Sequence, residues 1–432
     1  MQTDLPKDWS SEHLGDSCDH RTSNVDKKTK PSEPAVRLCN YTDVYREDRL
    51  GAHHPYMVAS ATYAEMARFR LQVGDVIITK DSETPDDIGV PSLITALPSD
   101  LPLVCGYHLT VIRPGAGVVP AFLAKQIGHA RIQSYFAVTA TGTTRYGLSN
   151  RTINEVPLWL PCRPEQGRIA EILDTIDEAI SKTEQVIHKL QQMKQGLLHD
   201  LLTRGIDENG ELRAPERHPE QFKPSPLGRI PKGWEVGPLS ERIAFITDYR
   251  GMTPPYTLDG VAVISAENVG GGVVKSTTKW VSAETYRRTT TRGFPEAGDT
   301  IFTTEAPVAE VARLPGDETY RLTRRVIALR PKMSVRKDFL YWSMFRLSEI
   351  GAWNGRIQGS TVPRILKPDI LACPFSVPSL VEQTTISSIL DTQQARICQE
   401  EEVVGKLRTL KKGLMDDLLT GRVRVAVPEV AS

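Results

Sequence analysis

Two stretches of the sequence gather basic side chains without any acid. The segment Arg321–Lys337 holds seven basic residues, and Trp353–Pro368 holds three more beside a tryptophan and small hydroxyl side chains. A third segment, 139–151, also lacks acids. Arginine can bind guanine and asparagine can bind adenine through paired hydrogen bonds, while cationic and hydroxyl groups contact phosphates. These segments therefore predict a DNA-binding surface, although a solvated face with incidental charge is the alternative. The predicted DNA-binding residues are Arg145, Tyr146, Asn150, Arg151, Arg324, Arg325, Arg356, Ser360, Thr361, Arg364 and Lys367.

Motifs for catalysis are missing from the sequence. It has no GxxxxGK(S/T) phosphate loop. The stretch "TPPYT" (253–257) is similar to the Pro-Pro-aromatic motif of amino-methyltransferases, but it begins with threonine and no glycine-rich cofactor loop precedes it. His53 and His54 have no partner at metal-ligand spacing, and the six cysteines form no CxxC pair. We therefore expect no catalytic residues, no cofactor and no metal site.

Composition sets broad limits on the class of protein. The 432 residues are too many for one core at ~150 residues per domain, so two or more domains are expected. Basic and acidic residues are equal in number, so any case for nucleic acid depends on local clustering. No apolar run reaches the ~20 residues of a membrane span, and the first residues show no secretion signal. We expect a cytoplasmic protein with reduced cysteines and no membrane contact.

The chain repeats itself, and the repeat extends over most of its length. "QMKQGLLHDLLTRGI" (192–206) recurs as "TLKKGLMDDLLTGRV" (409–423). The offset between matching residues is 225 at Leu5 and Ile230, and it settles at 217 from about Leu109 onward. Small shifts of this kind are left by a duplication, whereas chance matches would scatter. Further matching pairs are 38–44 with 263–269, 73–79 with 297–303, 110–114 with 327–331, 141–145 with 358–362 and 172–177 with 389–394.

Each copy divides into a globular part and a long helix. The first ~155 residues of a copy carry strand-like runs such as "DVIIT" and "RVIALR", and one short helix is expected in each, "PAFLAKQI" or "KDFLYWSMF". The last ~40 residues repeat apolar positions at spacings of three and four, which is the pattern of a coiled coil. The stripe in the first copy is Ile169, Ile172, Ile176, Ile180, Thr183, Ile187, Leu190, Met193, Leu197 and Leu201. The stripe in the second copy is Ile386, Ile389, Gln393, Ile397, Glu400, Val404, Leu407, Leu410, Leu414 and Leu418.

The order of these parts fixes how the helices can pair. The first helix leaves the first globular domain and leads to the second, so a second helix that packs on it must run back, antiparallel. We therefore predict an α+β chain built from a tandem-duplicated unit, in which two mixed α/β domains are separated by two long antiparallel coiled-coil helices. The expected divisions are 1–160 and 230–377 for the globular domains, 161–204 and 378–421 for the helices, 205–229 for a linker and 422–432 for a C-terminal tail.

Several motifs together resemble the specificity subunits of type I restriction-modification systems. They are the pairs Gly74-Asp75 and Gly298-Asp299, the loops "GTTRYGLSN" (142–150) and "GSTVPRILK" (359–367), the helix entries "PCRPEQGRIAEILD" (161–174) and "PSLVEQTTISSILD" (378–391), the helix ends "LLHDLLT" (197–203) and "LMDDLLT" (414–420), and the linker phrase "SPLGRIPKGWEV" (225–236). The resemblance covers essentially the whole chain.

The resemblance implies a non-catalytic DNA-binding subunit. Two target-recognition domains would each read one half of a bipartite site in double-stranded DNA. The long helices would set the spacing and bind two methyltransferase (modification) subunits, and restriction endonuclease subunits would join further. The segment 79–89 is more acidic than the family's pattern, and its match 303–311 also holds two acids, so direct phosphate contact by these two loops is not predicted.

Three other functions remain open from the sequence. One is a DNA-binding adapter of another assembly that has no methyltransferase partner. Another is an enzyme, either a methyltransferase or a nuclease fused to its own reader, which the missing cofactor loop opposes. The third is a coiled-coil scaffold whose globular domains bind protein.

Overall fold

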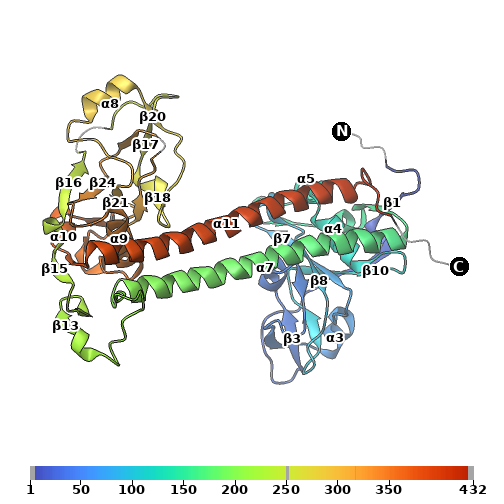
Figure 1. Cartoon of the computed structure of the whole chain (residues 1–432). Helices are drawn as coiled ribbons and strands as arrows, with labels where there is room; N and C mark the ends of the chain where they lie inside the picture. The colour runs from blue at the N-terminus through green and yellow to red at the C-terminus, as the bar shows by residue number, and fades with distance from the viewer. Residues whose placement is uncertain (1–4, 250–252, 317, 427–432) are drawn as a thin grey trace. The chain divides into compact units, whose positions relative to one another are not determined.

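The structure, a computed structural model, describes residues 5–249, 253–316 and 318–426, which form two compact units (Figure 1). The first unit contains residues 1–184 and 402–432, and the second contains 185–401. Each unit therefore combines one globular part with one half of each long helix. We call the described residues 5–162 the first head and the described residues between 202 and 379 the second head.

The first head is built on two mixed sheets in which most neighbouring strands are antiparallel. The larger sheet has the order β2-β10-β6-β8-β4, and the smaller has the order β5-β3-β9. Helix α4 (Pro120–Gly128) covers the larger sheet, and its Phe122 and Leu123 are fully buried in the core. The strands are β2 (Cys18–Thr22), β3 (Ala35–Cys39), β4 (Arg49–Leu50), β5 (Met57–Ser60), β6 (Val76–Thr79), β8 (Pro91–Ile94), β9 (Leu103–Cys105) and β10 (Leu109–Pro114).

The second head repeats this plan with the order β16-β24-β21-β22 in one sheet and β20-β17-β23 in the other. Helix α9 (Lys337–Glu349) takes the place of α4 and buries Phe339, Leu340 and Trp342. The strands are β16 (Ile243–Asp248), β17 (Val261–Ile264), β20 (Trp280–Val281), β21 (Thr300–Thr303), β22 (Val311–Arg313), β23 (Tyr320–Leu322) and β24 (Val326–Pro331). The mixed α/β architecture and its duplication are thus confirmed.

The helix content of the heads was underpredicted. The sequence indicated one short helix in each copy, at the positions of α4 and α9. The first head also has α3 (Tyr63–Phe69) and α5 (Ala130–Thr139), and the second also has α8 (Ala283–Thr289). These helices are short, and α3 and α8 are stabilised by a hydroxyl side chain at the N-cap rather than by a long apolar stripe, so periodicity does not reveal them.

The repeated Gly-Asp pairs have a structural role. Asp75 is buried at the start of β6, and its carboxylate accepts hydrogen bonds of 2.8 Å from Nε and Nη2 of Arg113 on β10. In the second head, Asp299 accepts hydrogen bonds of 3.0 and 2.8 Å from Nε and Nη2 of Arg330. The preceding glycines, Gly74 and Gly298, have φ of 92° and 77°, a conformation that favours glycine. Each pair joins a buried aspartate to a half-buried arginine on the neighbouring strand of the larger sheet.

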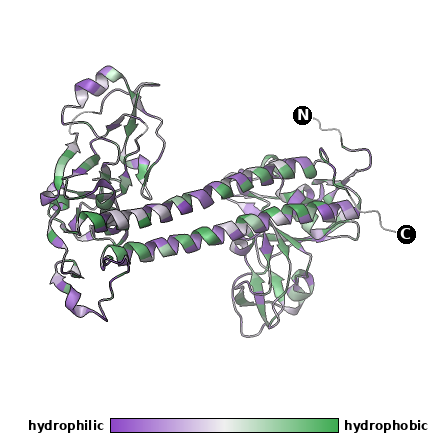
Figure 2. Ribbon diagram, viewed as in Figure 1, coloured by the Kyte–Doolittle hydropathy of each residue, from purple (hydrophilic) through white to green (hydrophobic). Residues whose placement is uncertain are grey.

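The long helices are α7 (Arg163–Leu201) and α11 (Leu380–Leu418), each of 39 residues. In the first unit, Lys411 lies 2.6 Å from Asp177 and Arg408 lies 2.7 Å from Glu184, so numbers rise along one helix as they fall along the other. This antiparallel pairing was predicted. Figure 2 shows hydrophobic and hydrophilic residues alternating along both helices. No helix in the described part of the chain is apolar over the length of a bilayer.

Matching positions on the helices differ in charge between the units. Burial raises the pKa of Asp177, but hydrogen bonds from Lys125 and Lys411 outweigh this effect, so the pKa lies below its ordinary value. Lys194, which matches Lys411, instead donates a hydrogen bond of 3.0 Å to the neutral Gln394. Without a paired carboxylate there, burial lowers the pKa of Lys194. The same contact is therefore an ion pair in the first unit and a hydrogen bond in the second.

The predicted apolar stripes do not lie wholly in the contact face between α7 and α11. Met193 and Leu410 match each other in the two copies, yet their side chains are 56% and 50% exposed. A pair of helices buries only a narrow face of each member, and these positions fall outside it. Part of the apolar stripe on each helix is therefore exposed to solvent.

The segments after the long helices are held by arginines. Arg213, which follows α7, donates a hydrogen bond of 2.6 Å to Glu382 at the start of α11. Arg424, which follows α11, contacts the buried Glu165 at the start of α7 at 2.7 Å and also Asp8 at 2.6 Å. The segment 205–229, expected as a linker, includes β13 (Phe222–Ser225) and the start of β14 (Gly228–Pro231), which form a hairpin that ends past the predicted boundary. Both returning segments therefore bind the start of a long helix.

Replacing Arg424 with alanine should destabilise the first unit. Glu165 would remain buried without its charged partner, and losing hydrogen bonds to a charged group costs about 2 kcal/mol. For a unit of this size, the melting temperature should fall by roughly 4–8 °C. The matched control is Arg422→Ala, because Arg422 pairs with Asp417 at the surface and such pairs contribute about 0–1 kcal/mol. Calorimetry showing equal melting temperatures for both variants would contradict this role of Arg424.

Candidate nucleic-acid interface

A tight hairpin presents the first predicted group of DNA-binding residues. Thr141 and Gly147 form an antiparallel bridge, and the residues between them are exposed or half-buried. Gly142 has φ of 143°, and a Cβ there would lie 2.0 Å from the carbonyl oxygen of Arg145. Only glycine fits this turn, which holds Thr143, Thr144 and Arg145 at an exposed tip.

The second head has a matching hairpin. Its strands are β25 (Ile357–Gln358) and β26 (Arg364–Ile365). Gly359 has φ of 88°, and a Cβ there would lie 2.8 Å from the carbonyl oxygen of Val362. Ser360 and Thr361 are exposed at this tip. The two hairpins are bridged at matching residues and each has a glycine with positive φ at the same position, but they differ in the side chains that they present.

An acid–base pair supports the base of each hairpin. In the first head, β7 (Asp81–Ser82) pairs with β11 (Tyr146–Gly147), and Asp81 makes a short contact with Nδ1 of His108. In the second head, the backbone of Glu305 forms a β-bridge with Arg364 of the hairpin. The side chain of Glu305 forms an ion pair of 3.2 Å with Arg325. The pair thus recurs, with histidine in one head and arginine in the other.

The arginine of the first tip is held beside this pair. Nη2 of Arg145 lies 3.1 Å from Nε2 and 3.3 Å from Nδ1 of His108. Asp87, further along the acidic segment, accepts a hydrogen bond of 2.8 Å from the hydroxyl group of Tyr45. Two acids of this segment, Asp81 and Asp87, therefore have partners within the head.

The remaining predicted residues are spread over neighbouring elements. Asn150 begins helix α6 (Asn150–Asn154), where its Oδ1 accepts a hydrogen bond of 3.2 Å from Thr22. Arg151 forms an ion pair of 2.8 Å with Glu155 on the same helix. In the second head, Nη1 of Arg356 donates to the carbonyl of Ala352 at 3.4 Å. Arg324 is exposed before β24, and Lys367 begins α10 (Lys367–Leu371).

The structure therefore brings some of the predicted residues together and separates others. Glu305 forms an ion pair with Arg325 and a backbone bridge with Arg364, and Arg145 and Tyr146 share one hairpin. Asn150 and Arg151 lie on a helix after the hairpin, where Asn150 accepts a hydrogen bond from Thr22 of β2 and Arg151 pairs with Glu155 on the same helix. Sequence reasoning missed His108 and Glu305. His108 could have been found from the repeat, because it matches Arg325 at the offset of 217.

Buried glutamines tie each head to its long helix and so position the hairpins. Oε1 of Gln166 on α7 accepts a hydrogen bond of 2.8 Å from the backbone of Val119, just before α4. Its Nε2 donates to the carbonyls of Gly117 and Pro161 at 3.0 and 2.9 Å. Gln383 on α11 makes the matching bonds with Arg336, Ser334 and Pro378. The two glutamines therefore bind backbone groups at equivalent positions in the two heads.

Known proteins similar to this chain come from type I restriction systems. The family model for the type I restriction modification DNA specificity domain matches residues 6–192. A putative type I restriction enzyme MjaX specificity subunit from Methanocaldococcus jannaschii is 23% identical, covering 98% of this chain and 95% of its own length. The MjaVIII specificity subunit from the same organism is 25% identical over 68% of each chain.

Solved structures share the fold. The S subunit of a type I restriction-modification system from M. genitalium aligns with a TM-score of 0.58 at 12% identity, covering 97% of both chains. A chain from a study of complex assembly and conformational transition in a type I restriction-modification system aligns with a TM-score of 0.53 at 19% identity, covering 98% of this chain and all of its own. Residues 6–192 thus match the type I restriction modification DNA specificity domain, and over nearly its whole length the chain is similar to specificity subunits of type I restriction enzymes.

Proposed function

We propose that each head reads one half of a bipartite site in double-stranded DNA, through its hairpin and the acid–base pair beneath it. The observation that carries this proposal is the contrast between scaffold and tip. The Asp–Arg pairs and the buried glutamines are the same in both heads. The tips differ, with Arg145 in one and Val362 at the matching position in the other. A shared scaffold with different exposed side chains suits two readers of different sequences.

The chemistry of the tips suits base and phosphate contact. Arginine offers a planar fork that binds guanine through two hydrogen bonds, and serine and threonine hydroxyl groups bind phosphates or bases. Arg145, Ser360, Thr361 and Arg364 are exposed in or beside the tips. His108 would then orient Arg145, and Glu305 would orient Arg325, rather than bind DNA themselves.

The long helices are proposed to set the gap between the half-sites. A continuous helix of 39 residues extends about 58 Å at ~1.5 Å per residue. This length corresponds to roughly 17 base pairs at ~3.4 Å each. The division between the two units falls at Glu184–Gln185 and Glu401–Glu402, so both helices continue from one unit into the other.

The exposed parts of the helices are proposed to bind two methyltransferase subunits. Leu410 and Met193 are half-exposed at matching positions. A glycine lies three residues after each, Gly413 and Gly196, and the space around its Cα is open. Two equivalent apolar patches suit two copies of one partner. Restriction endonuclease subunits would join this complex, and the chain would give adenine methylation and DNA cleavage their sequence specificity in the cytoplasm without catalysing either reaction.

Exchanging the first head for that of another specificity subunit tests the division between readers. Replacing residues 1–155 should change one half of the recognised sequence and leave the other half and the gap intact. Sequencing methylated sites in cells that carry the hybrid with its methyltransferase would show both halves at once. The control is the reciprocal exchange of the second head. A simultaneous change in both half-sites would contradict two independent readers.

Substituting the arginines of the hairpins tests their part in reading. Arg145→Ala should weaken binding through the first half-site, and Arg356→Ala or Arg364→Ala should act through the second. A base-reading arginine contributes ~1–3 kcal/mol of discrimination, roughly 5–150-fold in affinity. Arg145→Lys separates the roles, because lysine keeps the charge needed for phosphate but loses the paired hydrogen bonds.

Binding would be measured by fluorescence anisotropy on cognate and mismatched duplexes at several salt concentrations. The control is Arg168→Ala, since Arg168 pairs with Glu171 on the surface of α7, outside the hairpins. A phosphate contact would show as equal weakening on all duplexes and a smaller salt dependence. If all three alanine variants bind like the wild type, these arginines lie outside the interface.

Lengthening the helices tests their role as a spacer. Four residues inserted after Gln185 add about one turn, or ~6 Å, which equals one or two base pairs. Paired insertions after Gln185 and Glu402, which match at the offset of 217, should be tolerated better than either alone because both helices lengthen together. The preferred gap should lengthen while both half-sites stay the same. An active complex with an unchanged gap would show that the helices do not set the spacing.

A further inference from the structure

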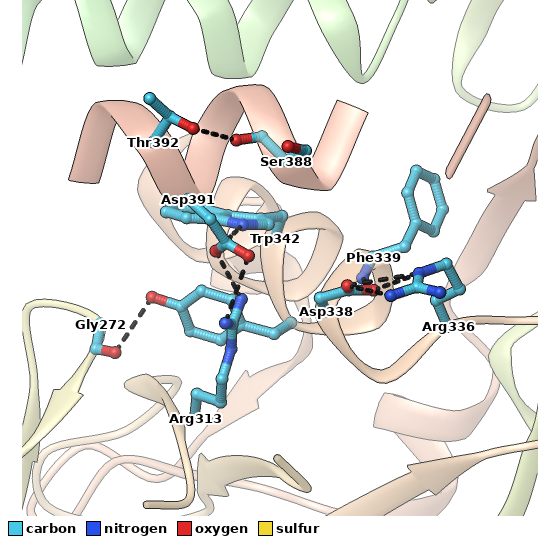
Figure 3. A network of polar contacts seen from close by, with 10 residues as sticks. Gly272, Arg313, Arg336, Asp338, Phe339, Trp342, Ser388, Asp391 and Thr392 are labelled. Carbon is cyan, nitrogen blue, oxygen red and sulfur yellow. Dashed lines mark hydrogen bonds and ion pairs between the residues drawn. The ribbon is translucent and has the colours of Figure 1, made fainter. Parts of the chain in front are cut away.

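One aspartate on each long helix joins the helix to two elements of its head. In the second unit, Asp391 of α11 accepts a hydrogen bond of 2.9 Å from Nε1 of Trp342 on α9. Nη2 of Arg313 on β22 lies 2.9 Å from the same carboxylate. Figure 3 shows Asp391 directed toward both side chains. The long helix α11, the covering helix α9 and the sheet strand β22 therefore contact one another through the carboxylate of Asp391.

The arginine of this cluster is itself held in place. Its guanidinium lies 4.6 Å from the centre of the Tyr341 ring, which fixes its plane. The hydroxyl group of Tyr341 donates a hydrogen bond of 3.0 Å to the carbonyl of Gly272. Gly272 has φ of 87°, and a Cβ there would lie 2.6 Å from that hydroxyl group. The cluster thus reaches from α11 to the turn before β19 (Val273–Val274).

The first unit has the same cluster made from different residues. Asp174 of α7, which matches Asp391, lies 3.2 Å from Nζ of Lys125 on α4 and also forms an ion pair with Arg49 on β4. Lys125 matches Trp342 at the offset of 217. Arg49 pairs with Leu93 in the sheet, and Leu93 occupies the place of Arg313. The partners have changed type or moved to the next strand, and the hydrogen bond from Lys125 goes to Asp177, but Asp174 keeps one charged contact with the covering helix and one arginine from the sheet.

The Asp391–Arg313 ion pair is better suited to direction than to stability. Asp391 and Arg313 are 38% and 34% exposed, and an ion pair of that exposure adds little to stability because solvent screens it. Apolar packing between head and helix is non-directional, whereas charged hydrogen bonds require a defined geometry. A contact that adds little stability but strong direction would hold a head at one angle on its helix.

We infer that Asp174 and Asp391 are positioning residues that fix the direction in which each head faces from its long helix. On the proposed function, on which this inference rests, they set how strictly the gap between half-sites is read. Loss of the carboxylate lets the head tilt, so that DNA with a neighbouring gap can also be bound.

The test measures binding against gap length. The wild-type chain, in complex with its methyltransferase, first selects its site from a randomised duplex pool. Duplexes with the selected half-sites and gaps changed by one or two base pairs are then compared. For Asp391→Ala, the preference for the correct gap should fall at least fivefold, while affinity for a duplex with the second half-site alone stays within twofold. Trp342→Phe should give a smaller loss, and Asp391→Asn should retain most of the preference, because its amide oxygen still accepts both hydrogen bonds.

The control is Glu178→Ala, since Glu178 pairs with Lys182 on the exposed surface of α7. Equal weakening of Asp391→Ala on every gap and on the isolated half-site would show a purely structural role and overturn the inference. So would an unchanged gap preference. If the wild type itself selects no bipartite site, the proposed function fails and this inference fails with it, so the wild-type selection tells the two failures apart.

Discussion

The hydrogen bonds at the start of each long helix are the contacts on which the rest of the structure depends. Gln166 and Gln383 are buried, and each uses its amide group to bind backbone of the head from the first turn of its long helix. A buried amide that lost these partners would cost free energy without compensation, so the junction has one favoured geometry. The adjacent Glu165 and Glu382 bind the arginines of the returning segments. One short motif therefore holds head, helix and returning chain together.

Duplication explains how the chain separates scaffold from reader. The structural contacts recur at matching positions, even where the residues differ, as with Lys125 and Trp342 beside the helix aspartates. The hairpin tips have diverged within the same backbone turn, which Gly142 and Gly359 preserve through positive φ. Divergence at the tips costs little stability because the tip side chains are exposed. A duplicated scaffold can thus acquire two sequence preferences without refolding.

Much of the fold could be predicted from the sequence, because the repeat and the helical periodicity are long-range signals. The helices α7 and α11, the covering helices α4 and α9, and the main strands follow from them. The residues that build the site were harder to predict. His108 and Glu305 contact residues distant in sequence, and Asn150 and Arg151, which stay predicted DNA-binding residues, have partners on β2 and α6 that the sequence does not reveal. Met193 and Leu410 follow the stripe yet face solvent, because periodicity gives an apolar face and not its partner.

The central claim is that two heads on one pair of helices read two separate half-sites. The most direct measurement is sequencing of duplexes that the intact chain, with its methyltransferase, retains from a fully randomised pool. The account predicts two different short sequences separated by a gap of fixed length and no base preference. One continuous sequence, two half-sites at variable distance, or an unenriched pool would contradict it.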